Sequence, residues 1–268
     1  MLNIQVRSRI VKDVSKITNI SLSQTSIAFN VYLKSVRIEI DTSTNDALDL
    51  KLYQNLFYSR ESAPIYEIVC NGHLIMSNYS VYSEEILAML AVMKMNNKPN
   101  VKMLMAGLGM GCTLRKALSY DTVAHIDVVE KIPAIVKWNK KYFCSINDYS
   151  LYDKRVRIIL CDFIKYVKNL YLDRTYDSII IDIDNGSKGA VLSENLEIYT
   201  VAFLKLVRNI LKANGSVFFW SLYKDRNFMD RLEKIFVNVK EHEVVENYLR
   251  LKSKSYIYSA KINEANNS

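Results

Sequence analysis

From Ser83 onwards, apolar segments typical of strands alternate with amphipathic segments typical of helices. We expect helices over Ser83–Asn96, Thr113–Ser119, Lys131–Phe143, Phe163–Tyr171, Asn195–Lys212 and Asn227–Phe236, and strands over Lys102–Ala106, Ile126–Val129, Arg157–Leu160, Ser178–Asp182, Gly215–Ser221 and Lys254–Ala260. Ser83 is a candidate N-cap of the first helix, and Gly215 is a candidate C-terminal stop of the long one. Such alternation indicates an α/β fold with an open, mostly parallel sheet.

The first 80 residues have a different pattern, mostly typical of strands. Val36–Asp41 alternates apolar and polar residues, and Ile65–Met76 holds two apolar runs around Asn71-Gly72. Asn-Gly favours a type I′ hairpin turn, in which both central residues have positive φ. The polar segment Thr42–Asp49 is expected to be a loop. We therefore predict a small antiparallel β unit over residues 1–80, which cannot bury a core alone, and a second domain over residues 81–268.

Composition limits the class of protein. Of the 268 residues, 50% are hydrophobic, which is enough for a sizeable core and excludes a disordered chain. No apolar run approaches the roughly 20 residues that span a bilayer, and the first residues lack the apolar segment of a signal peptide. The default expectation is a soluble cytoplasmic protein with no membrane partner.

Charged, sulfur and imidazole side chains exclude several chemistries. The net charge is +8, but Lys and Arg are spread along the chain, which favours an ordinary solvated surface or a modest anion-attracting face. Only three histidines are present, none in an HExxH motif, and a Ser-His-Asp hydrolase is disfavoured. No metal site is expected, because the four cysteines lie far apart and are interpreted as buried free thiols (Cys70, Cys112, Cys144 and Cys161).

A glycine cluster is the sharpest local signal. Gly107, Gly109 and Gly111 lie within five residues, directly after an apolar strand and before a helix. Glycine permits a tight turn and a close approach of the backbone to a ligand, which then faces the positive end of the helix. The spacing is GxGxG; Cys112 excludes the dinucleotide pattern GxGxxG, and a Gly-Lys-Ser/Thr phosphate loop is absent. A tight turn without a ligand is the alternative interpretation.

Acidic residues follow the next two strands. Glu130 lies about 20 residues beyond the glycine turn, where a carboxylate can accept both ribose hydroxyls. Asp162 follows the third strand and can accept from an adenine amino group, while Phe163 and Ile132 can flank the ring. Asp162 as a helix N-cap is an equally good interpretation, and the two roles can coexist. Glu130 as a plain surface carboxylate is its alternative.

The fourth strand ends in Asp182-Ile183-Asp184-Asn185-Gly186. Ligands of open α/β sheets bind outside the carboxyl ends of the strands. A carboxylate there can orient or deprotonate an amine or hydroxyl. Asp182 is therefore the candidate catalytic residue, with a loop-bracing role as the alternative.

Together these motifs resemble class I S-adenosylmethionine-dependent methyltransferases, and more narrowly their spermidine synthase branch. The stretches that carry the resemblance are MLMAGLGMG, DVVEKI, CDF, YDSIIIDID and IYTVAF…LKANGSVFF, over roughly residues 64 to 260. The resemblance implies a Rossmann-like sheet that binds S-adenosylmethionine or its decarboxylated form. It also implies that Tyr82 and Glu84 of a Tyr-x-Glu motif, Asp184, and Tyr199 of the following helix contact the substrate, and that subunits form a homodimer.

The chain departs from that branch at residues that hold an amine substrate. The Asp inside the branch's glycine loop is Met110 here, its Gln after the hairpin is Met76, and the His of its Tyr-x-Glu motif is Ser83. The Asp-Ser-x-Asp-Pro loop of the branch corresponds to Asp182-Ile183-Asp184-Asn185-Gly186 here. The first Asp is kept, and the second lies at a different position of the loop. Because each buried ammonium needs a partner, the nucleoside half of the site is intact and the polyamine half is altered.

These departures lead to a ranking of functions. We expect methyl transfer from S-adenosylmethionine to a small-molecule amine or hydroxyl. One alternative is aminopropyl transfer from decarboxylated S-adenosylmethionine to a polyamine such as putrescine. Another is a non-catalytic cofactor-binding or interaction module. A nucleic-acid acceptor is disfavoured, because the chain has no Asn/Asp-Pro-Pro-Tyr loop and no dense Arg patch.

Overall fold

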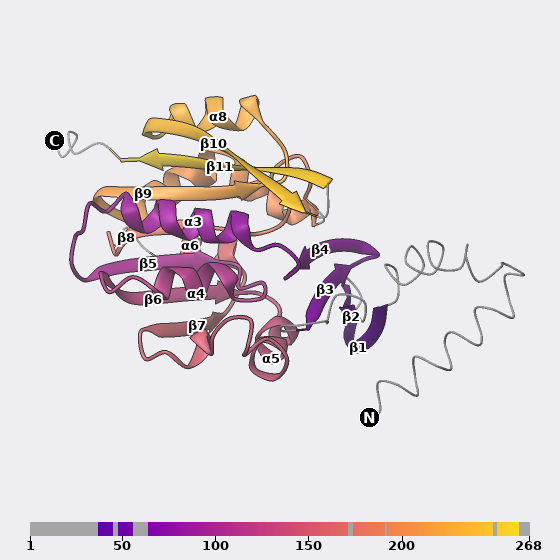
Figure 1. Cartoon of the computed structure of the whole chain (residues 1–268). Helices are drawn as coiled ribbons and strands as arrows, with labels where there is room; N and C mark the ends of the chain where they lie inside the picture. The colour runs from indigo at the N-terminus through magenta and orange to yellow at the C-terminus, as the bar shows by residue number, and fades with distance from the viewer. Residues whose placement is uncertain are drawn as a thin grey trace, which may run out of the picture.

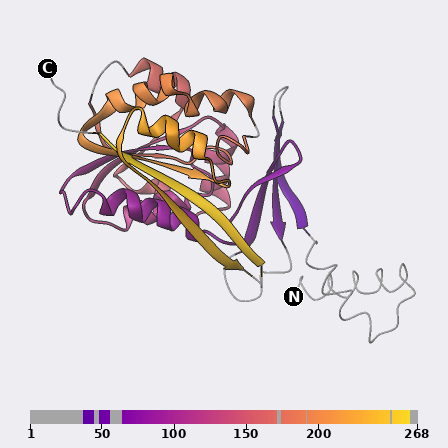
Figure 2. The same ribbon diagram turned by 90° about the horizontal axis from the view of Figure 1, so that it is seen from above.

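The computed structural model describes residues 37–44, 48–55, 64–170, 174–190, 192–248 and 251–262. They form two β-sheets, the larger of which is covered by helices (Figure 1). Seen from above, the smaller sheet lies beside one end of the larger sheet (Figure 2). The expected α/β class with an added N-terminal antiparallel unit is confirmed.

The larger sheet has seven strands in the order β10-β11-β9-β8-β5-β6-β7. All pairs from β9 to β7 are parallel, and β11 and β10 add an antiparallel edge. The strands are β5 (Val101–Ala106), β6 (Val123–Glu130), β7 (Val156–Leu160), β8 (Tyr176–Ile181), β9 (Leu211–Ser221), β10 (Val237–Tyr248) and β11 (Leu251–Lys261). The chain runs outward from β5 to β6 and β7, then returns to β8 on its other side. This reversal opens a crevice at the carboxyl ends of β5 and β8.

Helices cover both faces of this sheet. One core holds apolar side chains of α3 (Tyr82–Met93), α4 (Cys112–Leu118) and α5 (Pro133–Lys141). The other holds those of α6 (Phe163–Asn169), α7 (Val201–Ile210) and α8 (Arg226–Glu233). Two 3-10 helices, η1 (Ser150–Tyr152) and η2 (Ser193–Tyr199), lie in connections. Coverage of both faces explains why every residue of β8 is buried and its sequence is a continuous apolar run.

The smaller sheet is antiparallel in the order β1-β2-β3-β4. Its strands are β1 (Arg37–Thr44), β2 (Asp49–Asn55), β3 (Ile65–Cys70) and β4 (His73–Ser77). Asn71 and Gly72 have φ of 50° and 80°, so the predicted hairpin turn is confirmed. Leu50, Leu52 and Ile68 belong to the same core as Trp138 of α5. The small sheet therefore completes its core against the larger domain.

Several element predictions are wrong. The expected helix Asn195–Lys212 is interrupted at Thr200, which has extended backbone (φ −81°, ψ 150°) and caps α7 by accepting from Phe203 N at 3.2 Å. This helix ends at Ile210, before Gly215, because Leu211 is already paired in β9. The expected loop Thr42–Asp49 is shorter, since β1 continues to Thr44 and β2 begins at Asp49; its centre, 45–47, lies outside the described residues.

Ser83 is not an N-cap either. The cap position is Val81, which provides no side-chain hydrogen bond. Instead, Glu246 of the distant strand β10 accepts from Ser83 N at 2.8 Å and from Ser80 Oγ. The start of α3 is thus held by a tertiary contact.

β2 and β10 were not predicted. Strand β10 is rich in charged residues because it is an edge strand, and their polarity obscures the period of two. Across the described part of the chain, no helix is long and apolar enough to cross a membrane.

Candidate functional site

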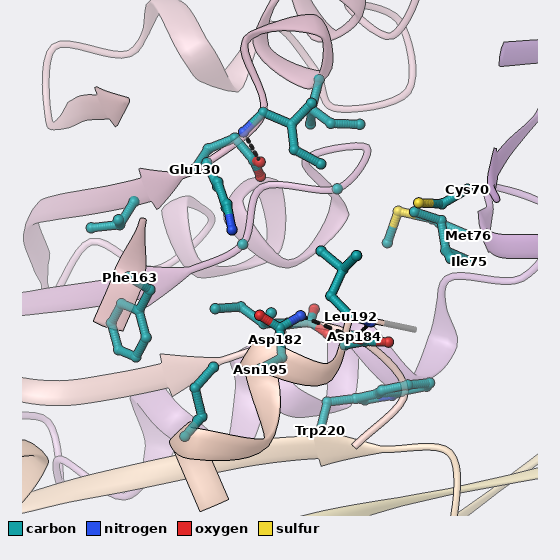
Figure 3. Close-up of a pocket in the computed structure, with 18 of the residues that line it drawn as sticks. Cys70, Ile75, Met76, Glu130, Phe163, Asp182, Asp184, Leu192, Asn195 and Trp220 are labelled. Atoms are coloured by element: carbon teal, nitrogen blue, oxygen red, sulfur yellow. Dashed lines mark hydrogen bonds between the residues drawn. The ribbon is translucent and has the colours of Figure 1, made fainter. Parts of the chain in front are cut away.

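A cavity opens at the carboxyl ends of the parallel strands, where the small sheet faces the larger one. Its lining comes from the glycine turn after β5, the ends of β6 to β9, the first turn of α3, and strands β3 and β4. In Figure 3, Phe163 lies at one side of this cavity, while Cys70, Ile75 and Met76 lie at the other. The cavity therefore has a side built by the α/β domain and a side completed by the small sheet.

The glycine turn brings the backbone close to two other segments. Gly107 has φ of 89°, and a Cβ there would lie 2.2 Å from the backbone oxygen of Asp182. Gly109 has φ of 53°, and its Cβ would lie 2.6 Å from Met76 Sδ. Both line the cavity. Gly111, with φ of 80°, is the N-cap of α4 and does not line the cavity; a Cβ there would meet the side chains of Asn139 and Asn147.

Glu130 is the last residue of β6, and its carboxylate is held by two backbone donors. Oε2 accepts from Leu108 N at 2.9 Å, and Oε1 accepts from Ile132 N at 2.8 Å. Burial raises the pKa of this carboxyl despite these hydrogen bonds. Each carboxylate oxygen has a second lone pair, so it can also accept from a hydroxyl group. Glu130 thus couples the glycine turn to the start of α5.

Asp162 follows β7 and lines the cavity, as do Phe163 and Ile132. Its Oδ1 accepts from Lys165 N at 3.1 Å, so the N-cap interpretation is confirmed. Its Oδ2 forms an ion pair with Lys131 Nζ at 3.1 Å. Burial opposes ionisation, but the Lys165 hydrogen bond and the Lys131 charge keep the pKa of Asp162 below its usual value.

Asp182 and Glu84 form the acidic part of the cavity. Asp182 follows β8 and its Oδ2 accepts from Thr113 Oγ1 at 3.1 Å. Glu84 lies in the first turn of α3 and its Oε2 accepts from Ser83 Oγ at 2.7 Å. Burial raises the pKa of Asp182 to about 6. Burial, followed by repulsion from Asp182, raises the pKa of Glu84 to about 7.

These two carboxyl groups lack a counter-ion. Among the described residues, no Lys, Arg or His forms an ion pair with either. A bound cation would lower both pKa values, because an opposite charge favours the ionised form. The arrangement can therefore bind an ammonium group and take a proton from it.

Asp184 also lines the cavity, but its carboxylate braces its own loop. Oδ1 accepts from Asn185 N at 2.8 Å, and Oδ2 accepts from Leu192 N at 3.1 Å and Asn195 Nδ2 at 3.0 Å. These hydrogen bonds stabilise the left-handed backbone conformation of Asp184, which has φ of 63°. The loop after β8 is therefore shaped before any ligand enters.

The two predicted tyrosines do not line the cavity. Tyr82 begins α3 and is 52% exposed. Tyr199 is buried, and its hydroxyl donates to Ile183 O at 3.3 Å, supporting the loop after β8 from beneath. Their roles in substrate contact stay predictions.

Several lining residues were not predicted from the sequence. Ile68 and Cys70 of β3, Ile75 of β4, and Trp220 of β9 form an apolar wall together with Met76. In strands, such residues have the pattern of core residues, so no local signal distinguished them. Met76 Sδ accepts from Met110 N at 3.1 Å, which ties this wall to the glycine turn.

A comparison with known protein families shows to which family the chain belongs. The family model described as "Spermine/spermidine synthase domain" matches residues 80–248. The chain belongs to the spermine/spermidine synthase family. The predicted resemblance is confirmed.

Curated relatives of this family are similar over part of the chain. A polyamine aminopropyltransferase of Saccharolobus solfataricus is 30% identical over 120 residues, which are 45% of this chain and 38% of the relative. One of Prochlorococcus marinus is 32% identical over 134 residues, 50% of this chain and 44% of the relative. The aligned regions thus span less than half of these relatives.

Solved structures of the family share the fold. Spermidine synthase from Thermotoga maritima has a TM-score of 0.63 at 19% identity and aligns over 83% of this chain and 72% of its own. A spermidine synthase in complex with the transition-state analogue AdoDATO has a TM-score of 0.66 at 19% identity, covering 83% of this chain and 73% of its own. These matches extend the fold of the spermine/spermidine synthase family to this chain.

The structure shows where the residues that differ from the family pattern lie relative to the cavity. Met110 is fully buried and does not line the cavity, whereas Met76 does. Ser83 donates to Glu84.

The comparisons support the aminopropyl alternative of the sequence analysis, and none of them supports methyl transfer, which was ranked first. Within the described residues, no group of three or more His, Cys, Asp or Glu side chains is placed to hold a metal ion.

Proposed function

We propose that this chain transfers the aminopropyl group of decarboxylated S-adenosylmethionine to an amine acceptor. One observation carries the proposal: Asp182 and Glu84 are two buried carboxyl groups that form no ion pair with another described residue, in a cavity of the spermine/spermidine synthase domain. A cationic amine would supply the missing charge. The relatives named polyamine aminopropyltransferases support the same reaction.

The nucleoside of the donor would occupy the side of the cavity around Glu130. There the carboxylate would accept the ribose hydroxyls, and Gly107 and Gly109 would let the backbone approach the sulfonium. Gly111 would hold the turn from the start of α4. Asp162 would accept from the adenine amino group, between Ile132 and Phe163.

The reaction would be a nucleophilic displacement at carbon. The acceptor's neutral amine nitrogen attacks the aminopropyl carbon next to sulfur, a C–N bond forms, and the C–S bond breaks. Sulfur keeps the electron pair and leaves as the neutral thioether of methylthioadenosine. An acceptor that enters as an ammonium must first lose a proton, and Asp182 is the proposed acceptor of it, with Glu84 as its partner. Alignment of nitrogen and carbon supplies much of the rate.

The small sheet would be part of the catalytic unit. We propose a boundary near residue 80, with residues 81–268 binding the donor and residues 1–80 contributing the wall at Met76. Pairing of two copies stays a prediction from the resemblance, which light scattering on the purified chain would check.

A donor comparison tests the proposed reaction. The full chain is incubated with a mixture of amines and either S-adenosylmethionine or its decarboxylated form, and products are read by mass spectrometry. An amine gaining one aminopropyl group, only with the decarboxylated donor, is expected. An amine gaining one methyl group would restore the methyltransferase hypothesis.

An Asp182→Asn variant is the matched control, since its volume is the same and its charge is lost. Binding of methylthioadenosine by this variant shows that the cavity is intact. Transfer by the variant at the wild-type rate would contradict the role of Asp182. The absence of any product from the wild-type chain, with the nucleoside still bound, would favour the non-catalytic alternative.

A further inference from the structure

Lys131 directly follows Glu130 in the chain, and it lines the cavity. Its Nζ forms an ion pair with Asp162 Oδ2 at 3.1 Å and donates to Glu194 Oε1 at 2.7 Å. A lysine ammonium has three N–H donors and no acceptor. Two of them are bonded to these carboxylates, and the third has no partner among the described residues. A charged donor is thus present in the cavity beside Asp162.

This ammonium is held from two separate elements. Asp162 is the N-cap of α6, whereas Glu194 belongs to η2, in the connection after β8. The side chain of Lys131 is 39% exposed and that of Asp162 is 18% exposed, so solvent reaches the pair only in part. Two ion pairs restrict a long, flexible side chain before any ligand binds, which lowers the cost of ordering it in a complex.

Asp162 Oδ2 and Lys131 Nζ place an acceptor and a donor side by side. Adenine presents the complementary pair: its exocyclic amino group donates, and the ring nitrogens N1 and N7, which flank that group, accept. A carboxylate by itself binds only the amino group, whereas the carboxylate with the ammonium can bind two groups of one edge. A two-point contact of this kind discriminates between bases, as bidentate contacts to adenine do in DNA recognition.

We propose that Lys131 reads the base of the donor: it donates to a ring nitrogen beside the amino group of adenine, while Asp162 accepts from that amino group. This proposal rests on the proposed function, which puts the adenine between Ile132 and Phe163. Glu194 is a positioning residue, because it acts on the base only through Lys131. Glu130 and Lys131, neighbours in sequence, then bind the ribose and the base of the same nucleoside.

Three nucleosides that differ at a single ring position test this contact. They are methylthioadenosine and its 1-deaza and 7-deaza analogues, in which a C–H group replaces N1 or N7. Each is titrated calorimetrically into the full chain and into the Lys131→Met variant. We expect Lys131→Met to weaken the binding of methylthioadenosine about tenfold. The same substitution should have little effect on one of the two analogues, because that analogue has already lost the contact.

A role of Lys131 in holding Asp162 alone would give a different result. Loss of its charge would then weaken all three nucleosides by the same factor, because all three keep the amino group. An equal loss for the three, or no loss for any, overturns the inference and leaves the proposed function standing. Lys165→Met is the control, since Lys165 is an exposed residue of α6 that does not line the cavity; its affinities should equal those of the wild type.

A conservative variant keeps the inference testable if Lys131→Met does not fold. Lys131→Arg retains a charged donor, so it should bind methylthioadenosine within a few-fold of the wild type and still discriminate against the same analogue. Loss of that discrimination in a folded Lys131→Arg chain would count against a hydrogen bond from residue 131. If the wild-type chain binds none of the three nucleosides, the proposed donor site fails and the inference fails with it.

Discussion

At the scale of single residues, the glycine turn shows that neighbouring glycines are required for different reasons. A Cβ at Gly107 would meet a backbone oxygen, which can move only if the strand end moves. A Cβ at Gly109 would meet the end of the Met76 side chain, which can adopt another rotamer. Both positions have positive φ, where L side chains are strained.

We therefore predict that Gly107→Ala costs roughly 2–4 kcal/mol of unfolding free energy, and that Gly109→Ala costs less, roughly 1–2 kcal/mol. Chemical denaturation measures both. A Met76→Ala substitution should relieve part of the cost of Gly109→Ala and none of the cost of Gly107→Ala. Equal relief at both positions would show that the contacts in the turn are not as described.

The hydrogen bonds of Glu130 lead to a second prediction for a single residue, which concerns nucleoside binding. Gln in its place keeps one acceptor oxygen and loses the charge, so Leu108 N or Ile132 N loses its partner and the proposed ribose contact weakens. Hydrogen bonds to charged groups contribute about 1.5–3 kcal/mol, so methylthioadenosine should bind about ten- to a hundredfold more weakly to Glu130→Gln. Calorimetric titration measures this. Unchanged affinity would remove Glu130 from the donor site.

At the scale of elements, strand β10 controls the start of helix α3. Glu246 accepts from Ser83 N and Ser80 Oγ, and Glu84 is the next residue along the helix. The C-terminal hairpin thus fixes a carboxylate of the candidate site from a distance of more than 160 residues in sequence.

Removing this tether should affect the acceptor more than the donor. In Glu246→Ala we expect KM for the amine to rise several-fold while methylthioadenosine affinity stays unchanged, because the hydrogen bonds and the ion pair that hold Glu130 and Asp162 come from the glycine turn, the start of α5 and the first turn of α6. Glu243→Ala is the control, since Glu243 lies on the same strand and its carboxylate bonds to the exposed Lys254 at 2.8 Å and to Tyr256, both of which belong to β11. A parallel loss of both affinities would indicate general unfolding of the hairpin.

At the scale of the whole molecule, the acidic pair links stability to pH. The pKa values of Asp182 and Glu84 rise from 3.8 and 4.5 to about 6 and about 7 in the folded chain. Between pH 4 and 7 the folded chain therefore holds more of these protons than the unfolded chain does. Raising the pH through this window lowers the free energy of unfolding. Their contribution to stability is highest below pH 4, declines as pH rises through this window, and is constant above it.

Glu84→Gln should remove the larger part of this decline. We expect the variant to be more stable than the wild type at pH 8 and no more stable at pH 4, since it removes one buried charge and its repulsion of Asp182. Thermal melts at both pH values measure the difference, and Glu233→Gln, an exposed residue of α8, is the control. The same substitution should weaken amine binding. A gain in stability of equal size at both pH values would rule out titration as its cause.

Local sequence determined most of the large domain. The period of the apolar residues, the glycines at positions of positive φ and the Asn-Gly turn are local properties, so the parallel strands, the glycine turn and the hairpin were predictable. So was the side of the cavity around Glu130, the proposed donor site, because a carboxylate at the end of a parallel strand must lie at the ligand-binding edge. Thr200 shows the limit of periodicity: a helical pattern continues across it, but its hydroxyl caps a new helix.

Only the tertiary structure decided the other side of the cavity, where the acceptor is proposed to bind. Trp220, Ile68 and Cys70 have the pattern of core residues, and their position on a cavity wall depends on how the small sheet packs against the end of the larger one. The repulsion between Glu84 and Asp182 and the hydrogen bond from Ser83 N to Glu246 bring together segments far apart in the chain. Such contacts depend on packing across the whole fold, which no window of sequence contains.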